Sequence, residues 1–150
     1  GGGFGLVLAC DLAVVADDAD LGTPEVKRGL FPMMIAALIY EQLPKKHANE
    51  LVLLGGKVQG ARAVELGIAN KSVPRDRVLA EAMAYATSLA SLSPSVMQLG
   101  KRAINEQHDM PFQQKLAFLR DQLTINTQLE DAAEGITAFL QKREPNWSGR

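Results

Sequence analysis

The 150-residue sequence is poor in the residues that most often carry covalent or metal chemistry. It contains one cysteine, two histidines and one tryptophan, and aromatic residues make up 5% of it. A single cysteine, Cys10, excludes an intrachain disulfide, and with His47 and His108 it offers no metal-ligand spacing. We therefore expect no metal site, and we interpret Cys10 as a buried packing residue of a cytoplasmic protein in a reducing environment.

Charge of one sign and long apolar runs are also missing. Sixteen basic against seventeen acidic side chains give a net charge of −1, so no basic excess is present to hold nucleic acid or an anionic membrane. Asp11, Asp17, Asp18 and Asp20 interrupt the most apolar region, which leaves no run of about 20 apolar residues to span a membrane. The last three lack the spacing of a calcium loop and predict a solvated turn.

Glycine, in contrast, is concentrated where the chain starts. Gly1-Gly2-Gly3-Phe4-Gly5 precedes the apolar residues 6–10, which predicts a glycine loop followed by a short buried helix. Without a Cβ, such a loop lets a ligand approach the backbone, and the helix points unpaired N–H groups at it. We expect the natural chain to extend before Gly1, because no initiator methionine is present; a purification linker is the alternative origin of these glycines.

The pattern of apolar residues divides the chain into two parts. Residues 12–16 predict a buried strand, 21–25 a short extended piece and 68–73 an extended return, with helices between them, including one over residues 45–54. From residue 74 onward the apolar spacing is helical, and later helices begin near Ser93-Pro94, Pro111 and Asp131. The sequence therefore predicts an α/β part over residues 1–73 and an all-helical part over residues 74–150.

Glu25 is the leading candidate for acid/base chemistry. Pro24 pushes Thr23 out of the α region and removes one backbone donor, which places Glu25 just after the edge of a strand. A partly buried carboxylate there suits proton transfer. The alternative is an ordinary first-turn glutamate beside a helix N-terminus.

Four motifs in order resemble the enoyl-CoA hydratase/isomerase (crotonase) family, and the resemblance covers essentially the whole chain, as the C-terminal three-fifths of a family member. The matching residues are Gly1-Gly2-Gly3-x-x-Leu6 with Asp11; Leu21-Gly22-x-Pro24-Glu25 with Gly29; Leu54-Gly55 with Gly60-Ala61-x-Ala63 and Gly67-Ile68-Ala69-Asn70; and Glu130-Asp131-x-x-Glu134-Gly135-x-x-Ala138-Phe139-x-x-Lys142-Arg143.

This resemblance implies a crotonase-like spiral of ββα turns, of which residues 1–73 form the C-terminal part. Residues 74–150 would then serve oligomerisation and coenzyme A binding. It also implies trimers or dimers of trimers, acyl-CoA thioesters as substrates, and no cofactor other than the coenzyme A of the substrate.

The resemblance also assigns roles to single residues. Glu25 matches the acid/base, and Gly2 matches one of two backbone donors that hold the thioester oxygen; the second donor belongs to an earlier loop that this sequence does not contain. Gly5 departs from the pattern, because hydratases of the family carry a second glutamate there. One carboxylate favours double-bond isomerisation; the alternatives are a hydratase-type lyase and a non-catalytic coenzyme A-binding or oligomerisation protein.

The remaining candidates would bind the substrate. The glycines would allow its close approach, Pro32 and the two methionines would shape the acyl pocket, and the lysines would meet the phosphates or adenine of coenzyme A. Each has a plainer alternative: packing glycines, core methionines and solvated charges. These candidates are Gly1, Gly3, Gly5, Pro32, Met33, Met34, Lys101 and Lys142.

Overall fold

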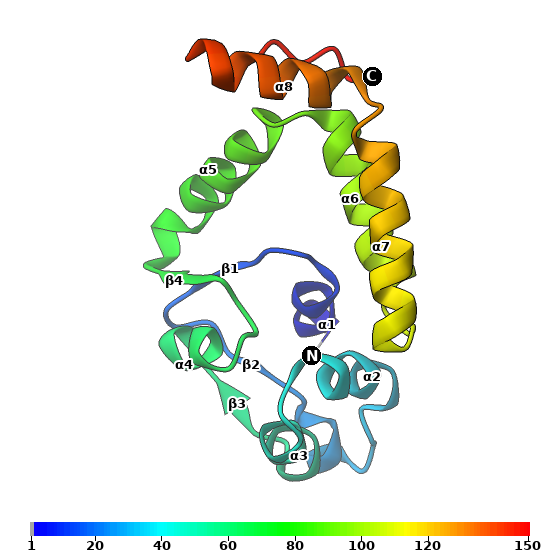
Figure 1. Cartoon of the computed structure of the whole chain (residues 1–150). Helices are drawn as coiled ribbons and strands as arrows, with labels where there is room; N and C mark the ends of the chain where they lie inside the picture. Colours follow the sequence, from blue (N-terminus) through cyan, green and yellow to red (C-terminus); the bar gives the residue numbers. More distant parts are fainter. Residues whose placement is uncertain (1) are drawn as a thin grey trace. The chain divides into compact units, whose positions relative to one another are not determined.

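The computed structural model describes residues 2–150, and the chain forms two compact units, residues 1–85 and 86–150 (Figure 1). The first unit alternates short helices and strands. Its elements are α1 (Gly2–Ala9), β1 (Val14–Ala16), β2 (Leu21–Gly22), the 3₁₀ helix η1 (Pro24–Arg28), α2 (Met33–Gln42), α3 (Lys45–Leu54), β3 (Lys57–Val58), α4 (Gly60–Glu65), β4 (Lys71–Val73), the 3₁₀ helix η2 (Arg75–Arg77) and the first part of α5 (Val78–Ala90).

Two small sheets organise the first unit. β1 and β4 are parallel, with Val14 opposite Lys71 and Ala16 opposite Val73, and their connection contains the intervening helices, as parallel pairing requires. β2 and β3 are antiparallel. β1 and β4 lie within predicted extended segments, whereas β3 was not predicted, because two residues are too few to show an alternating pattern.

The core of the first unit lies between α1, α2, α3, α4 and the strands. Helix α3 has the predicted bounds, because Pro44 precedes it and Gly55 ends it in the left-handed conformation at φ 60°. Ile39, Ala48, Val52 and Ala63 are fully buried. The complete buried cluster comprises Phe4, Leu8, Val15, Leu21, Ile39, Leu43, Ala48, Leu51, Val52, Ala63, Ile68 and Ala69.

A close backbone contact fixes where β2 ends. A Cβ at Gly22 would lie 2.2 Å from the carbonyl oxygen of Gly56, so only glycine fits there. One residue later, the buried Thr23 donates its hydroxyl to the carbonyl oxygen of Leu51 at 2.7 Å. Together these contacts hold the start of η1 against α3.

The division between the two units falls inside α5, after residue 85. Side chains tie the first part of this helix to β4: Lys71 lies 2.8 Å from the Glu81 carboxylate and 5.6 Å from the ring centroid of Tyr85. The predicted division after residue 73 followed the change in apolar periodicity, which does not register these contacts, and it stays a prediction.

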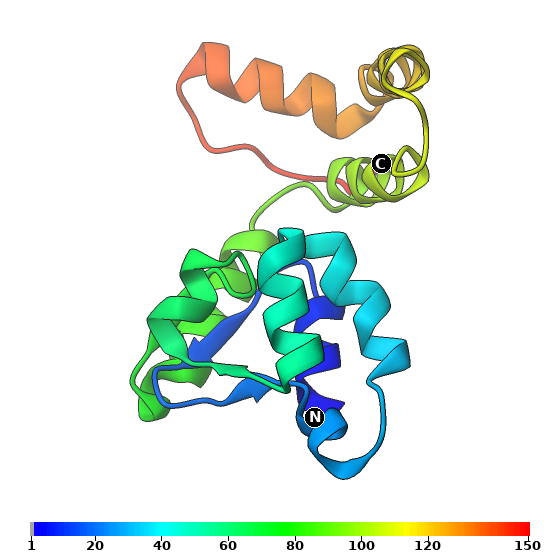
Figure 2. The same cartoon turned by 90° about the horizontal axis from the view of Figure 1, so that it is seen from below.

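Helices α6 (Pro94–Glu106), α7 (Phe112–Asn126) and α8 (Glu130–Gln141) follow in the second unit (Figure 2). α6 packs against both α7 and α8. Ser93 caps α6 by accepting a hydrogen bond from Val96 N at 3.2 Å, and Pro94 occupies the first helical position. Within residues 2–150, no helix combines the length and apolarity needed to cross a membrane.

A buried carboxylate holds the C-terminal residues to the second unit. The Asp131 side chain, 1% exposed, accepts hydrogen bonds from Ser93 Oγ at 2.6 Å, Ser148 N at 2.7 Å and Gly149 N at 3.1 Å. Burial opposes its ionisation, but hydrogen bonds from these serines and Ser95 outweigh that effect and lower the pKa of Asp131 to about 2. We call these five residues the tail anchor.

Two further contacts reinforce the tail anchor. Trp147 donates its indole N–H to the carbonyl oxygen of Ser91 at 2.9 Å, and its ring lies so close to Gly135 that a Cβ there would be 3.2 Å away. Arg143 forms a two-pronged ion pair with Glu134, at 2.6 and 2.9 Å, which lowers the pKa of Glu134 to about 2. The residues after α8 are therefore packed rather than free.

Candidate active site

Glu25 lies in the first turn of η1, where the sequence predicts it just after a strand edge. Pro24 occupies the first position of this 3₁₀ helix, and Gly29 ends it in the left-handed conformation at φ 76°. The Glu25 carbonyl oxygen also accepts a hydrogen bond from Leu30 N at 3.1 Å. The backbone around Glu25 is thus fixed on both sides by residues with restricted or special conformations.

The Glu25 side chain is not held in the same way. Its Oε2 atom is buried and has no hydrogen-bond partner among residues 2–150. Buried polar atoms are nearly always hydrogen-bonded, because leaving one without a partner costs free energy. An unpartnered carboxylate oxygen therefore indicates a position kept available for a group that is not part of the described chain.

A cavity of about 560 Å³ opens beside this carboxylate. That volume is within the range of roughly 300–1,000 Å³ typical of small-molecule sites. Among its described lining residues, Glu25 is the only one with a polar side chain. The lining comprises Gly2, Gly5, Glu25, Phe31, Pro32, Met33, Met34, Ile35 and Leu38.

Helix α1 brings glycine backbone to the same cavity. The helix begins at Gly2, so the predicted glycine loop before a helix over residues 6–10 is wrong: Gly2, Gly3 and Gly5 lie within α1. The first N–H groups of a helix have no partner within it. At Gly2 and Gly3 a Cβ would meet no described atom within 4 Å other than those of the adjacent residues and of the helix's own backbone. Gly2 and Gly5 line the cavity, Gly3 does not, and Gly1 lies outside the described residues.

Helix α2 supplies the apolar side of the cavity. Pro32 is buried, whereas Met33 and Met34 are 70% and 88% exposed. The two methionines therefore line the rim and are not core residues. Sequence reasoning did not assign Phe31 and Ile35 to the site, although Ile35 and Leu38 lie three positions apart on α2, the spacing of one helical face.

The two predicted coenzyme A-binding lysines lie in the second unit. Lys101 is exposed on α6. Lys142 is exposed at the end of α8, where its backbone has φ 54°, a left-handed conformation that is uncommon for residues other than glycine. Its neighbour Arg143 forms an ion pair with Glu134 at 2.6 Å.

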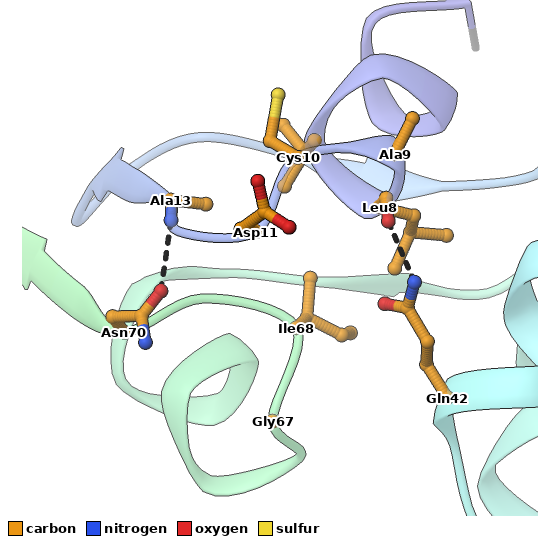
Figure 3. Close-up of a pocket in the computed structure, with 10 residues that line it drawn as sticks. Leu8, Ala9, Cys10, Asp11, Ala13, Gln42, Gly67, Ile68 and Asn70 are labelled. Carbon is orange, nitrogen blue, oxygen red and sulfur yellow. Dashed lines mark hydrogen bonds between the residues drawn. The ribbon is translucent and has the colours of Figure 1, made fainter. Parts of the chain in front are cut away.

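A second cavity, of about 330 Å³, shares no lining residue with the first. Figure 3 shows Gln42 Nε2 donating to the carbonyl oxygen of Leu8, at 2.6 Å, and Ala13 N donating to Asn70 Oδ1, at 2.8 Å. Cys10 is exposed here, so its predicted burial is wrong; α1 ends at Ala9, and Cys10 follows in a bend. The motif residue Asn70 thus supports the start of β1 and does not contribute to the Glu25 cavity.

The acidic turn after β1 is held by ion pairs. Arg75 lies 3.0 Å from the Asp18 carboxylate, and Lys57 lies 2.5 Å from that of Asp20. Hydrogen bonds from Lys57 and Gln59 lower the pKa of Asp20. No group of three or more histidine, cysteine, aspartate or glutamate side chains within residues 2–150 is arranged to hold a metal ion.

Known proteins resemble this chain over its whole length. A family model described as enoyl-CoA hydratase/isomerase matches residues 1–150. The mouse protein named enoyl-CoA hydratase domain-containing protein 3, mitochondrial, is 38% identical over 148 residues, covering 97% of this chain and 49% of its own length. The Escherichia coli 2,3-dehydroadipyl-CoA hydratase is 33% identical over 151 residues, covering 100% of this chain and 59% of its own.

Solved structures agree with these matches. The crystal structure of human enoyl-CoA hydratase domain-containing protein 3 superposes with a TM-score of 0.93 at 35% identity, covering 97% of this chain and 57% of that one. The crystal structure of a Geobacillus kaustophilus enoyl-CoA hydratase subunit superposes with a TM-score of 0.92 at 34% identity, covering 100% of this chain and 59% of that one. The chain therefore has the helix-rich α/β fold of these structures and spans about half to three-fifths of the length of the proteins it matches.

Proposed function

Because this chain belongs to the enoyl-CoA hydratase/isomerase family, we propose that the protein processes an acyl-CoA thioester in the cavity beside Glu25, with Glu25 as the acid/base. The resemblance carried by the four motifs is confirmed across residues 1–150. Its placement in the C-terminal three-fifths of a family member is not confirmed by these matches.

The observation that carries the proposal is the buried, unpartnered Oε2 of Glu25. In double-bond isomerisation, this oxygen takes a proton from the carbon next to the thioester carbonyl, and the electron pair moves onto the carbonyl oxygen as a dienolate. The carboxyl group then returns the proton two carbons further along the acyl chain, and the double bond moves into conjugation. One carboxylate is sufficient, because it gives back the proton that it takes.

The first turn of α1 is suited to stabilising the thioester oxygen during this reaction. Negative charge develops on the thioester oxygen, and a backbone N–H aimed at it contributes about 2.7–4 kcal/mol of transition-state stabilisation. We assign this role to the backbone N–H of Gly2, which lines the cavity and has no side chain to block the approach of the thioester. A second donor would come from sequence outside these 150 residues.

Isomerisation is preferred to hydration because of the cavity lining. Adding water across a double bond needs a water molecule that is oriented and deprotonated, a task that two carboxylates share in the hydratases resembled here. Glu25 is the only polar side chain that lines the described cavity, and Gly5 offers no second carboxylate. Hydration is the alternative, because several relatives are named hydratases.

The rest of the assembly is also part of the proposal. We assign Lys101 and Lys142 to the phosphates or adenine of coenzyme A, the helices after residue 73 to oligomerisation as trimers or dimers of trimers, and residues 1–73 to a spiral of ββα turns. The chemistry requires no cofactor beyond the coenzyme A of the substrate. The cytoplasmic location stays a prediction, since the name of the mouse relative places that protein in mitochondria.

Glu25→Gln in the full-length protein tests the acid/base role. Loss of a positioned acid/base lowers kcat by about 10²- to 10⁴-fold, while calorimetric titration with an acyl-CoA should show binding close to that of the wild type. Glu50→Gln, at an exposed position on α3, is the matched control and should retain full activity. Near-normal turnover by Glu25→Gln overturns the assignment, and a wild type that binds acyl-CoA without turnover supports the non-catalytic alternative.

A further inference from the structure

The side chain of Ile35 forms the wall of the Glu25 cavity in front of Gly5. A Cβ at Gly5 would lie 3.7 Å from Ile35 Cδ1 and 3.8 Å from Cγ1, which is ordinary van der Waals contact. Ile35 is partly buried and packs against the core of the first unit. Its end methyl group thus fills the space that a side chain longer than alanine at position 5 would enter along that direction.

This wall decides which groups can be held next to Glu25. A water molecule or hydroxyl group in a largely apolar cavity needs several hydrogen-bond partners, typically 2–4 for a buried water. The described lining offers one polar side chain, Glu25 itself. A second hydrogen-bond partner for such a group could be placed opposite Gly5, but the surface there is the aliphatic end of the Ile35 side chain.

We propose that Ile35 is a specificity-determining residue: by filling the space in front of Gly5, it keeps water and hydroxyl groups from being held beside Glu25. The cavity then favours acyl chains in the unsaturated, unhydrated form over the corresponding 3-hydroxyacyl thioesters. This inference rests on the proposed function and assigns to Ile35 the discrimination between enoyl and 3-hydroxyacyl thioesters.

Threonine and valine provide a matched pair at this position. Both Ile35→Val and Ile35→Thr remove the Cδ1 methyl group, and they differ only in whether a hydroxyl group replaces a methyl group. The full-length protein and both variants are titrated with a 2-enoyl-CoA and with the 3-hydroxyacyl-CoA of the same chain length. Thermal unfolding shows that each variant is folded.

The wild type should bind the enoyl compound about tenfold more tightly, the effect of one hydroxyl group placed in an apolar site. Ile35→Val should keep most of this preference, Ile35→Thr should lose it, and the ratio of hydration to isomerisation should rise in Ile35→Thr. A wild type without the preference, or a threonine variant that behaves like the valine variant, overturns the inference.

A second pair covers the case in which Ile35→Thr does not fold. Gly5→Ala adds a methyl group at an acceptable distance from Ile35 and should keep the preference, whereas Gly5→Ser adds a hydroxyl group at the same wall and should weaken it. Equal preferences in the two variants contradict the inference. A wild type that binds no acyl-CoA at all is a separate result, which overturns the proposed function and this inference with it.

Discussion

Each unit of the chain contains a carboxylate near the start of a helix, and the two are held in opposite ways. Asp131, in the second unit, accepts hydrogen bonds from three serine side chains and from the backbone of Ser148 and Gly149. Glu25, in the first unit, has a buried oxygen without any partner in the described chain. The number of hydrogen bonds therefore separates a carboxylate that stabilises the fold from one that is available to a ligand.

The largest expected difference is in thermal unfolding. Asp131→Asn places an amide group where Gly149 N and the serine hydroxyls donate, so the midpoint of unfolding of the second unit should fall by roughly 10 °C. Glu25→Gln removes no hydrogen bond formed by Oε2 and should leave the midpoint unchanged or raise it. Asp121→Asn, at an exposed aspartate on α7, is the control with little expected effect. If Asp131→Asn and Glu25→Gln lowered the midpoint of unfolding equally, the distinction between the two carboxylates would be wrong.

Lowering the pH should have a smaller effect, confined to the carboxylates that hold the tail. The folded-state pKa values of Asp131 and Glu134 are about 2, below the ordinary values of 3.8 and 4.5. Because both are lowered, their stabilising contribution is complete above about pH 4.5 and is lost as the pH falls toward 2. The fluorescence of Trp147, the only tryptophan, should therefore report a tail that stays packed at pH 5 and detaches between about pH 4 and pH 2.

In the Asp131→Asn variant, this acid transition should lose the part that comes from residue 131. The remaining part, from the pair of Glu134 with Arg143, should persist. A transition that is unchanged in the variant would show that Asp131 does not hold the tail.

The smallest expected effect comes from Trp147→Phe. The substitution keeps an aromatic ring near Gly135 but removes the hydrogen bond to the carbonyl oxygen of Ser91, which costs about 0.5–1.5 kcal/mol. Urea unfolding measures the change. A loss as large as that of Asp131→Asn would mean that packing of the ring, and not the buried carboxylate, is the main attachment of the tail.

Local signals in the sequence predicted the frame of the site well. Proline and glycine act through their own backbones, so Pro44 and Gly55 defined α3 and Pro24 placed Glu25 after β2. The position of Asp131 near the start of a helix was also predicted, and it lies in the first turn of α8.

The contacts of these residues were not predictable in the same way. Ser93 and Ser148 lie 38 and 17 positions from Asp131, and no periodicity links them. Composition also misled the prediction of burial, because an apolar side chain need not be inside. Cys10 is exposed although its burial was predicted, whereas Met33 and Met34 form the exposed rim of a cavity whose wall includes Ile35, a residue to which the sequence assigned no role.

The contact of Gly22 with Gly56 has a consequence for how the sequence around this site can vary during evolution. Glu25 follows a point where two segments of the main chain touch, so its position depends on the absence of a side chain at Gly22 more than on the identity of the side chains around it. Neighbouring apolar residues can then be exchanged, and the cavity beside Glu25 reshaped, while the carboxylate keeps its position. Sequence variation should therefore concentrate in α2 and spare Gly22.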